Sequence, residues 1–171
     1  MHDAEQTFRC FVGARLPALK RAAWLLTGDV HLAEDLVQTA LAKVAMRWER
    51  VAANGDPEPY VRKILYHEHV SAGRKRRFIE VLGSHGREQP SGTDTTADVS
   101  LRLTVRQALE RLTPKQRAVL VLRYYEDLSE SQAAERLDVS VGTVRSQTRA
   151  ALARLRAVAP ELASVMEVTR D

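Results

Sequence analysis

The sequence is poor in the residues that support disulfides, strands and membrane spans. A single cysteine, Cys10, stands among 171 residues, which excludes an internal disulfide and a cysteine-based metal cluster. Aromatic residues make up only 5% of the chain, and its Ala/Leu/Arg/Glu-rich composition favours helices over strands. No run of 18 apolar residues occurs and no signal-peptide pattern is visible, so we expect no membrane insertion and a cytoplasmic protein.

The positive charge is concentrated in two segments. The net charge is only +4, which permits a nucleic-acid partner without demanding one. Residues 60–80, however, hold six basic residues against two acidic ones, and residues 145–156 hold four arginines and no acid. A hydrophobic content of 44% is enough to bury a core, so these segments belong to a folded chain.

A polar stretch divides the sequence into two blocks. Residues 83–98 read GSHGREQPSGTDTTAD and show no apolar periodicity, which is typical of a flexible linker. A loop of this length inside one compact domain would be unusual. We therefore predict an all-α protein with two small helical domains, residues 1–82 and residues 99–171, joined by the linker.

Helix signals are clear in the first block. Apolar residues recur at helical spacing over residues 8–26, where Pro17 should start, bend or interrupt a helix. Gly28-Asp29 reads as a helix end followed by an N-cap, and one amphipathic helix is expected from there through Trp48. Asp56-Pro57 reads as the start of a third helix that ends in the basic run 74–77.

The second block contains a helix-turn-helix pattern. Capping boxes begin at Thr113 and at Ser129, and the second box opens a short helix that ends near residue 137. The turn 138–140 leads into a long helix that ends near residue 158. We expect Asp138 to tolerate a left-handed backbone and Val139 to plug the corner, and Tyr125 to lie on the buried side of the preceding helix.

The long last helix has an outward side suited to a major groove. At 100° per residue, Val144, Ala151 and Leu155 face the domain, whereas the opposite side is small, polar and basic near its start. Arginine can bind guanine with two hydrogen bonds, and hydroxyl or amide groups can hold phosphates. The alternative is an ordinary solvated helix face. The candidate DNA contacts are Ser140, Gly142, Thr143, Arg145, Ser146 and Arg149.

Residues 112–156 resemble region 4 of extracytoplasmic-function (ECF) sigma factors. Their sequence is similar to that of an actinobacterial sigma-E-like subfamily and reads LTPKQRAVLVLRYYEDLSESQAAERLDVSVGTVRSQTRAALARLR. The stretch LTGDVHLAEDLVQTALAKV, residues 26–44, resembles the region 2 helix that binds the polymerase β′ clamp. The stretch PYVRKILYHEHVSAGRKRR, residues 59–77, resembles the segment that melts and reads the −10 element.

The resemblance implies a sigma factor whose partners are core RNA polymerase (β and β′ subunits), promoter DNA and, as a further candidate, an anti-sigma factor. The last helix would read the −35 element. Residues implied in core binding are Asp35, Leu36 and Gln38, and those implied in −10 binding are Arg62, Lys63, His67, Arg74, Lys75, Arg76 and Arg77.

One departure from the family pattern concerns Ala72-Gly73, where many relatives have a Trp pair. Aromatic faces would stack on unpaired bases. Their absence predicts promoter complexes that form readily but open incompletely.

Two other functions fit parts of the sequence. A free-standing DNA-binding regulator would use the same helix-turn-helix, but the first block shows no convincing phosphoacceptor, ligand pocket or dimer seam. A protein that only sequesters polymerase or an anti-sigma factor would agree with the altered Ala72-Gly73. No catalytic constellation is visible, no cofactor is expected, and His67-Glu68-His69 lacks the i, i+4 histidine spacing of a helical metal pair.

Overall fold

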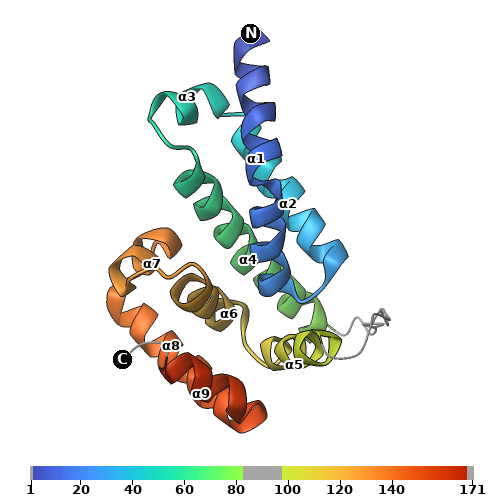
Figure 1. Cartoon of the computed structure of the whole chain (residues 1–171), viewed down its shortest axis with the longest axis vertical. Helices are drawn as coiled ribbons and strands as arrows, with labels where there is room; N and C mark the ends of the chain where they lie inside the picture. The colour runs from blue at the N-terminus through green and yellow to red at the C-terminus, as the bar shows by residue number, and fades with distance from the viewer. Residues whose placement is uncertain (1, 83–97, 169–171) are drawn as a thin grey trace.

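The computed structural model describes residues 2–82 and 98–168, and in these ranges every regular element is helical. The predicted linker, residues 83–98, lies outside the described residues except for Asp98, where a helix begins. Figure 1 shows α1 running beside α2 and α4, with the later helices gathered across one end of this group. The elements are α1 (His2–Thr27), α2 (Val30–Ala45), α3 (Trp48–Ala53), α4 (Glu58–Val81), α5 (Asp98–Glu110), α6 (Pro114–Leu120), the π-helical turn η1 (Val121–Tyr125), α7 (Glu130–Leu137), α8 (Val141–Val158) and α9 (Pro160–Val168).

Local capping fixes where several of these helices begin, as the sequence predicts. The side chain of Asp29 accepts a hydrogen bond from the backbone N–H of Leu32 at 2.9 Å, directly after Gly28 with φ +69°. Thr113 and Ser129 each complete a capping box with the glutamine three residues later. Each cap satisfies backbone donors that a helix N-terminus leaves unpaired.

Two expectations about helix boundaries were wrong. The helix expected through Trp48 ends at Ala45, and a separate short helix, α3, begins at Trp48. The Trp48 ring packs against two rings of α1: its centroid lies 5.1 Å from that of Phe8 and 5.2 Å from that of Phe11. This contact accompanies the departure of the chain from the α2 axis. α4 runs past the basic run to Val81. α8 ends at Val158, as the sequence predicts, but a further helix, α9, follows it.

The expected burial of Tyr125 was also wrong. α6 continues into the π-helical turn η1, whose wider repeat rotates later residues relative to an α-helix. Tyr125 therefore points out of the core and is 47% exposed.

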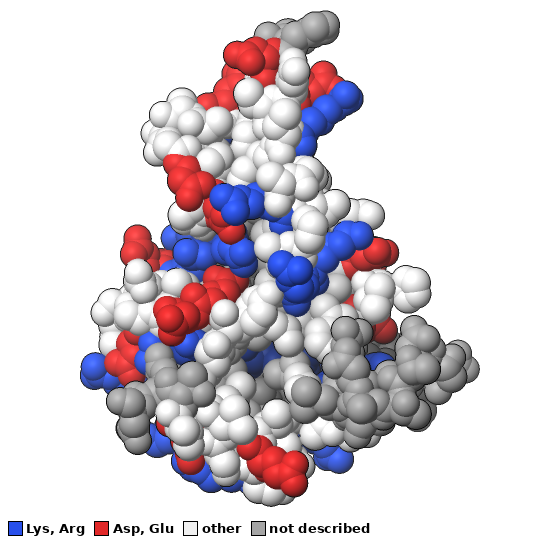
Figure 2. Space-filling view, in the orientation of Figure 1, with Lys and Arg blue, Asp and Glu red and all other residues white. Residues whose placement is uncertain are grey.

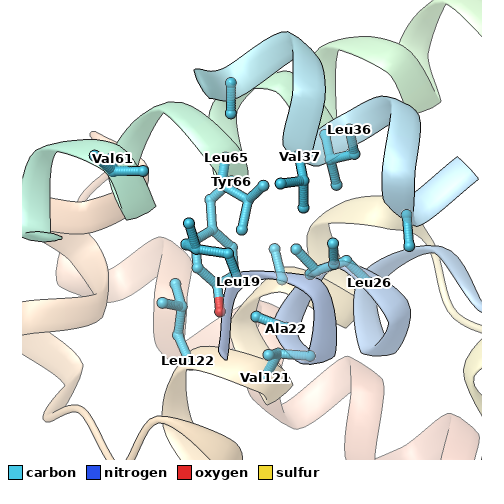
Figure 3. Close-up of a cluster of buried hydrophobic side chains, with 14 of the residues drawn as sticks. Leu19, Ala22, Leu26, Leu36, Val37, Val61, Leu65, Tyr66, Val121 and Leu122 are labelled. Atoms are coloured by element: carbon cyan, nitrogen blue, oxygen red, sulfur yellow. The ribbon is translucent and has the colours of Figure 1, made fainter. Parts of the chain in front are cut away.

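One hydrophobic core joins the two halves of the chain. Figure 3 shows Leu19, Ala22 and Leu26 of α1 beside Val121 and Leu122 of η1, and all five are buried. The same cluster takes in the buried faces of α2 and α4 and the inner residues of α7 and α8. A smaller cluster holds α5 against α8 and α9. The sequence predicts two helical units, but it does not predict that they pack on each other.

Candidate nucleic-acid interface

The helix-turn-helix is built as the sequence predicts, apart from one corner residue. Ala133 and Ala134 are buried where α7 meets α8, because small side chains let two helices approach closely. Asp138 adopts the left-handed conformation, with φ 57° and ψ 48°, and ends α7. Val139 does not plug the corner: it is 39% exposed, whereas Leu137 and Val141 on either side of the turn pack against the core.

Short-range hydrogen bonds hold the start of α8. The hydroxyl of Ser140 accepts from the backbone N–H of Thr143 at 3.1 Å and lies 2.9 Å from the Thr143 hydroxyl. The hydroxyl of Ser146 donates to the backbone carbonyl of Thr143 at 3.0 Å. Gly142 is exposed between them. This end of the helix therefore presents a preformed polar surface with fixed backbone geometry.

Two arginines project from the same side of α8. Arg149 is exposed, and Arg145 is exposed while its Nε donates to a carboxylate oxygen of Glu130 in α7 at 2.7 Å. Val144, Ala151 and Leu155 on the opposite side are buried, as the helical phase predicts. The predicted −35 residues thus share one outward surface, formed by the turn and the first half of α8.

The predicted −10 residues do not form a comparable open surface. Arg62, in the first half of α4, donates to Glu58 at 3.0 Å and to Glu126 of the second half of the chain at 2.5 Å, and its side chain is only 14% exposed. Burial lowers the pKa of Arg62, but the carboxylates of Glu126 and Glu58 outweigh that effect and raise it. Tyr66 donates to the same Glu126 oxygen at 2.8 Å. Arg62 is therefore a structural cation in this conformation.

Other −10 candidates lie along the rest of α4. His67, Arg74, Lys75 and Arg77 are exposed, and Lys63 is half-buried. A hollow of about 270 Å³ is lined by residues of α4, α6, α7 and α8, among them His67 and Arg74 from the −10 set and Thr143 from the −35 set. The two predicted DNA surfaces therefore meet at one hollow.

His69, to which the sequence assigns no role, is buried between the halves. Its Nε2 donates to the backbone carbonyl of Pro114 at 3.1 Å, and the ring is 2% exposed. Burial, together with the positive charges of Arg117 and Arg76, lowers the pKa of His69 to about 3. The role of His69 and of Glu126 depends on contacts between residues 45 or more positions apart, which no local pattern encodes.

Of the three residues predicted to bind core polymerase, two are exposed and one is buried in the hydrophobic core. Asp35 and Gln38 are exposed on α2, whereas Leu36 is 6% exposed and packs in the shared core. Its helical phase directs the side chain inward with Val37 and Ala40, so a contact between Leu36 and polymerase is not supported. Asp35 also lines a hollow of about 160 Å³ with Arg76, the remaining −10 candidate.

Surface charge is mixed rather than banded on the face drawn in Figure 2. Acidic and basic side chains alternate over the described residues there, without a continuous basic stripe. In the described ranges no three His, Cys, Asp or Glu residues gather as a metal site, and none of the helices found there is long and apolar enough to cross a membrane.

Comparisons with known proteins match each half of the chain to a protein-family model. Residues 11–79 match the family model "Sigma-70 region 2", and residues 102–155 match "Sigma-70, region 4". The RNA polymerase sigma-E factor of Streptomyces coelicolor is 38% identical over 87% of this chain and 84% of its own length. The ECF RNA polymerase sigma factor SigL of Mycobacterium tuberculosis is 33% identical over 84% of each chain. The solved structure of sigma factor RpoE from Bartonella quintana, in complex with the anti-sigma factor NepR, is similar with a TM-score of 0.71 at 25% identity, over 91% of this chain and 98% of that one.

Proposed function

This chain belongs to the ECF family of RNA polymerase sigma factors, and from that premise we propose which of its residues carry each part of the task. A sigma factor binds core RNA polymerase and directs promoter-specific initiation of transcription. Residues 1–82 act as region 2, which binds core polymerase and the −10 element. Residues 99–171 act as region 4, which binds the −35 element. The protein works in the bacterial cytoplasm at the nucleoid as a regulatory subunit without catalytic activity of its own.

The outward side of α8 reads the −35 element. The observation that carries this assignment is the surface made by the Ser140 cap, Gly142, Thr143, Arg145 and Arg149 at the N-terminal half of an exposed helix. Residues near the start of a recognition helix meet base edges in the major groove. Arg149 supplies a base or phosphate contact, and the Ser140–Thr143 end of the helix holds a backbone phosphate.

The basic half of α4 contacts the −10 element. Arg74, Lys75 and Arg77 provide the phosphate contacts, and His67, about two helical turns earlier, is a polar contact to a base. Arg62 joins this surface only when its ion pair with Glu126 is broken. Asp35 and Gln38 on the exposed side of α2 contact the polymerase clamp.

The test compares alanine variants of three arginines on α8 in reconstituted holoenzyme. Arg145→Ala and Arg149→Ala should each weaken promoter binding by roughly 1–3 kcal/mol, whereas exposed Arg154→Ala, further along the helix, serves as the control. A base contact would also relax sequence preference. A phosphate contact would weaken all sequences alike and lower the salt slope by about one. Footprints of both variants identical to wild type would exclude this surface.

An anti-sigma factor is a further partner of this chain. The support is the likeness to RpoE, whose solved structure holds the anti-sigma factor NepR. Co-purification of the intact chain from its own bacterium, with and without core polymerase, would identify such a partner.

A further inference from the structure

The hollow that His67, Arg74 and Thr143 share has the size and the lining of a small-molecule site. Its volume is about 270 Å³, just below the range of about 300–1,000 Å³ that is typical of sites for drug-sized ligands. Residues of α4, α6, α7 and α8 and of the turn before α8 line it. A ligand in this hollow would therefore contact several helices at once, and its chemistry can be inferred from their side chains.

Two cations from different helices line the hollow without a partner. Arg74 of α4 and Lys115 of α6 are exposed, and within the described part of the chain neither makes an ion pair or a side-chain hydrogen bond. Arg62, on the same helix as Arg74, is by contrast paired with two carboxylates. A guanidinium presents paired donors that match a phosphate, and an ammonium adds a compact charge. The pair therefore favours a phosphate group, which carries close to two negative charges near neutral pH.

The rest of the lining suits an organic group attached to that phosphate. Val119 is buried and Val139 is 39% exposed, and both supply apolar surface to the hollow. The half-buried amide of Gln147 lines it too, with no hydrogen-bond partner among the described residues. The carboxylate of Asp138, the one acidic group in the described lining, can accept hydrogen bonds from sugar hydroxyls, as acidic residues do at the ribose of dinucleotide sites. Apolar surface with a few polar groups of this kind is typical of a ligand pocket.

We propose that this hollow binds a small organic phosphate of the nucleoside monophosphate class. Arg74 and Lys115 hold the phosphate, and the sugar and base lie over the apolar lining within reach of Asp138 and Gln147. Arg74 and Thr143 are also candidate DNA contacts, so the ligand and promoter DNA compete for them. That competition rests on the proposed function, whereas binding of the ligand to the free chain does not.

The test is calorimetric titration of the free full-length chain with AMP, GMP, CMP and UMP. The nucleoside alone and inorganic phosphate alone represent the two parts of the ligand. We expect at least one nucleotide to bind more tightly than either part. Arg74→Gln/Lys115→Gln should weaken its binding about tenfold or more, because hydrogen bonds between charged groups are the strong ones in such a site.

The matched control is Lys75→Gln/Arg77→Gln. These residues are exposed, belong to the same basic run as Arg74 and do not line the hollow, yet their replacement removes the same two charges. Binding should stay within about twofold of wild type, because salt screens charges that do not touch the ligand. All four replaced side chains are exposed, and circular dichroism checks that both variants are folded.

Nuclear magnetic resonance locates the ligand in the wild-type chain. Backbone amide signals around Arg74, Lys115 and Gln147 should shift together with one midpoint, because one ligand contacts α4, α6 and α8. Shifts confined to α4 would instead show an anion on the basic run alone and would overturn the proposal.

Three further results would also overturn it. The first is the absence of binding by all four nucleotides, and the second is equal weakening in the two double variants. The third is inorganic phosphate binding as tightly as the nucleotides, which would leave no role for the apolar lining. A chain that binds a nucleotide but not core polymerase would contradict the proposed function and leave the ligand site in place.

Discussion

The two predicted DNA surfaces differ in what holds them. The surface on α8 is organised by contacts within its own helix-turn-helix: the Ser140 cap, the left-handed Asp138 and the Arg145–Glu130 pair. The surface on α4 is tied to the other half of the chain through Glu126 and Pro114. The surface on α8 is therefore preformed in the free protein, whereas residues of the α4 surface are engaged by the other half of the chain.

The difference predicts which substitutions affect stability and which affect only binding. Residues that join the halves are buried or half-buried, and their loss leaves unpaired polar groups. Arg145 and Arg149 on the outward side of α8 are exposed, so their loss is expected to change binding rather than stability. The predictions below test this separation.

The largest effect is expected at Glu126. Glu126→Ala leaves Arg62 without its second carboxylate and Tyr66 without an acceptor, in a site where the side chains of Arg62 and Glu126 are 14% and 9% exposed. Removing one partner of a buried ion pair typically costs 3–5 kcal/mol, and partial exposure reduces this to about 3 kcal/mol of unfolding free energy. Urea denaturation measures the loss.

The matched control is Glu110→Ala. Glu110 pairs with Arg106 one turn earlier on the same helix and is 38% exposed, so its loss should cost about 0.5 kcal/mol or less. Equal losses for Glu110→Ala and Glu126→Ala would mean that the interface between the halves contributes no more than a surface pair.

Local signals explain why much of the fold could be predicted from the sequence. The capping boxes at Thr113 and Ser129, the Asp29 cap and the buried side of α8 each depend on residues within a turn or two of one another. Membership of the sigma family follows from the same kind of contiguous motif. The candidate −35 residues on α8 therefore share one outward surface, as their helical phase predicts.

Most features that the sequence did not predict depend on contacts between residues distant in sequence. Trp48 leaves α2 because it packs on Phe8 and Phe11. Arg62 reads as a free basic residue until Glu126, 64 positions later, is placed beside it. Leu36 is an exception: it follows the exposed Asp35 in a recognisable motif, but the helical phase of α2, a local signal, places it on the buried side with Val37 and Ala40.

The next effect is a pH dependence from His69. Its pKa is lowered to about 3 in the folded protein, against an ordinary value of about 6.5. Between these values the unfolded chain binds more protons than the folded one, so stability falls as the pH drops from 6.5 toward 3. We expect a loss of about 1 kcal/mol per pH unit between pH 6 and 4, measured by urea denaturation.

Carboxylates also titrate in this range. The contribution of His69 is therefore measured as the difference between wild type and His69→Gln in the slope of stability against pH. The glutamine side chain of this variant keeps a donor for the Pro114 carbonyl but does not titrate, so the slope of stability against pH should be shallower. Exposed His31→Gln is the control and should follow wild type. A His69→Gln slope equal to that of wild type would show that His69 is not held neutral between the halves.

A smaller effect is expected at Gln38, which lies outside the contact between the halves. Because Gln38 is exposed on α2, it is available to a partner in the free protein. Gln38→Ala should weaken binding to core polymerase by about 1 kcal/mol, the usual size for an interface residue, without changing stability. Exposed Gln107→Ala in α5 is the control, and calorimetric titration of core with each variant measures the affinity. Equal affinities for both variants would remove Gln38 from the core-binding surface.

The smallest effect tests whether the α8 surface is as ready for DNA as its geometry indicates. The Arg145–Glu130 pair is solvated, with side chains 62% and 34% exposed, so it adds little to stability. Glu130→Gln should therefore leave unfolding unchanged within about 0.5 kcal/mol. It also removes a carboxylate that repels phosphate and competes for Arg145, so promoter binding by holoenzyme should tighten about twofold at low salt and less at high salt. Exposed Glu135→Gln in the same helix is the control. Weaker binding in Glu130→Gln would mean that Glu130 positions Arg145 for DNA, and then the α8 surface, like that of α4, depends on a carboxylate partner.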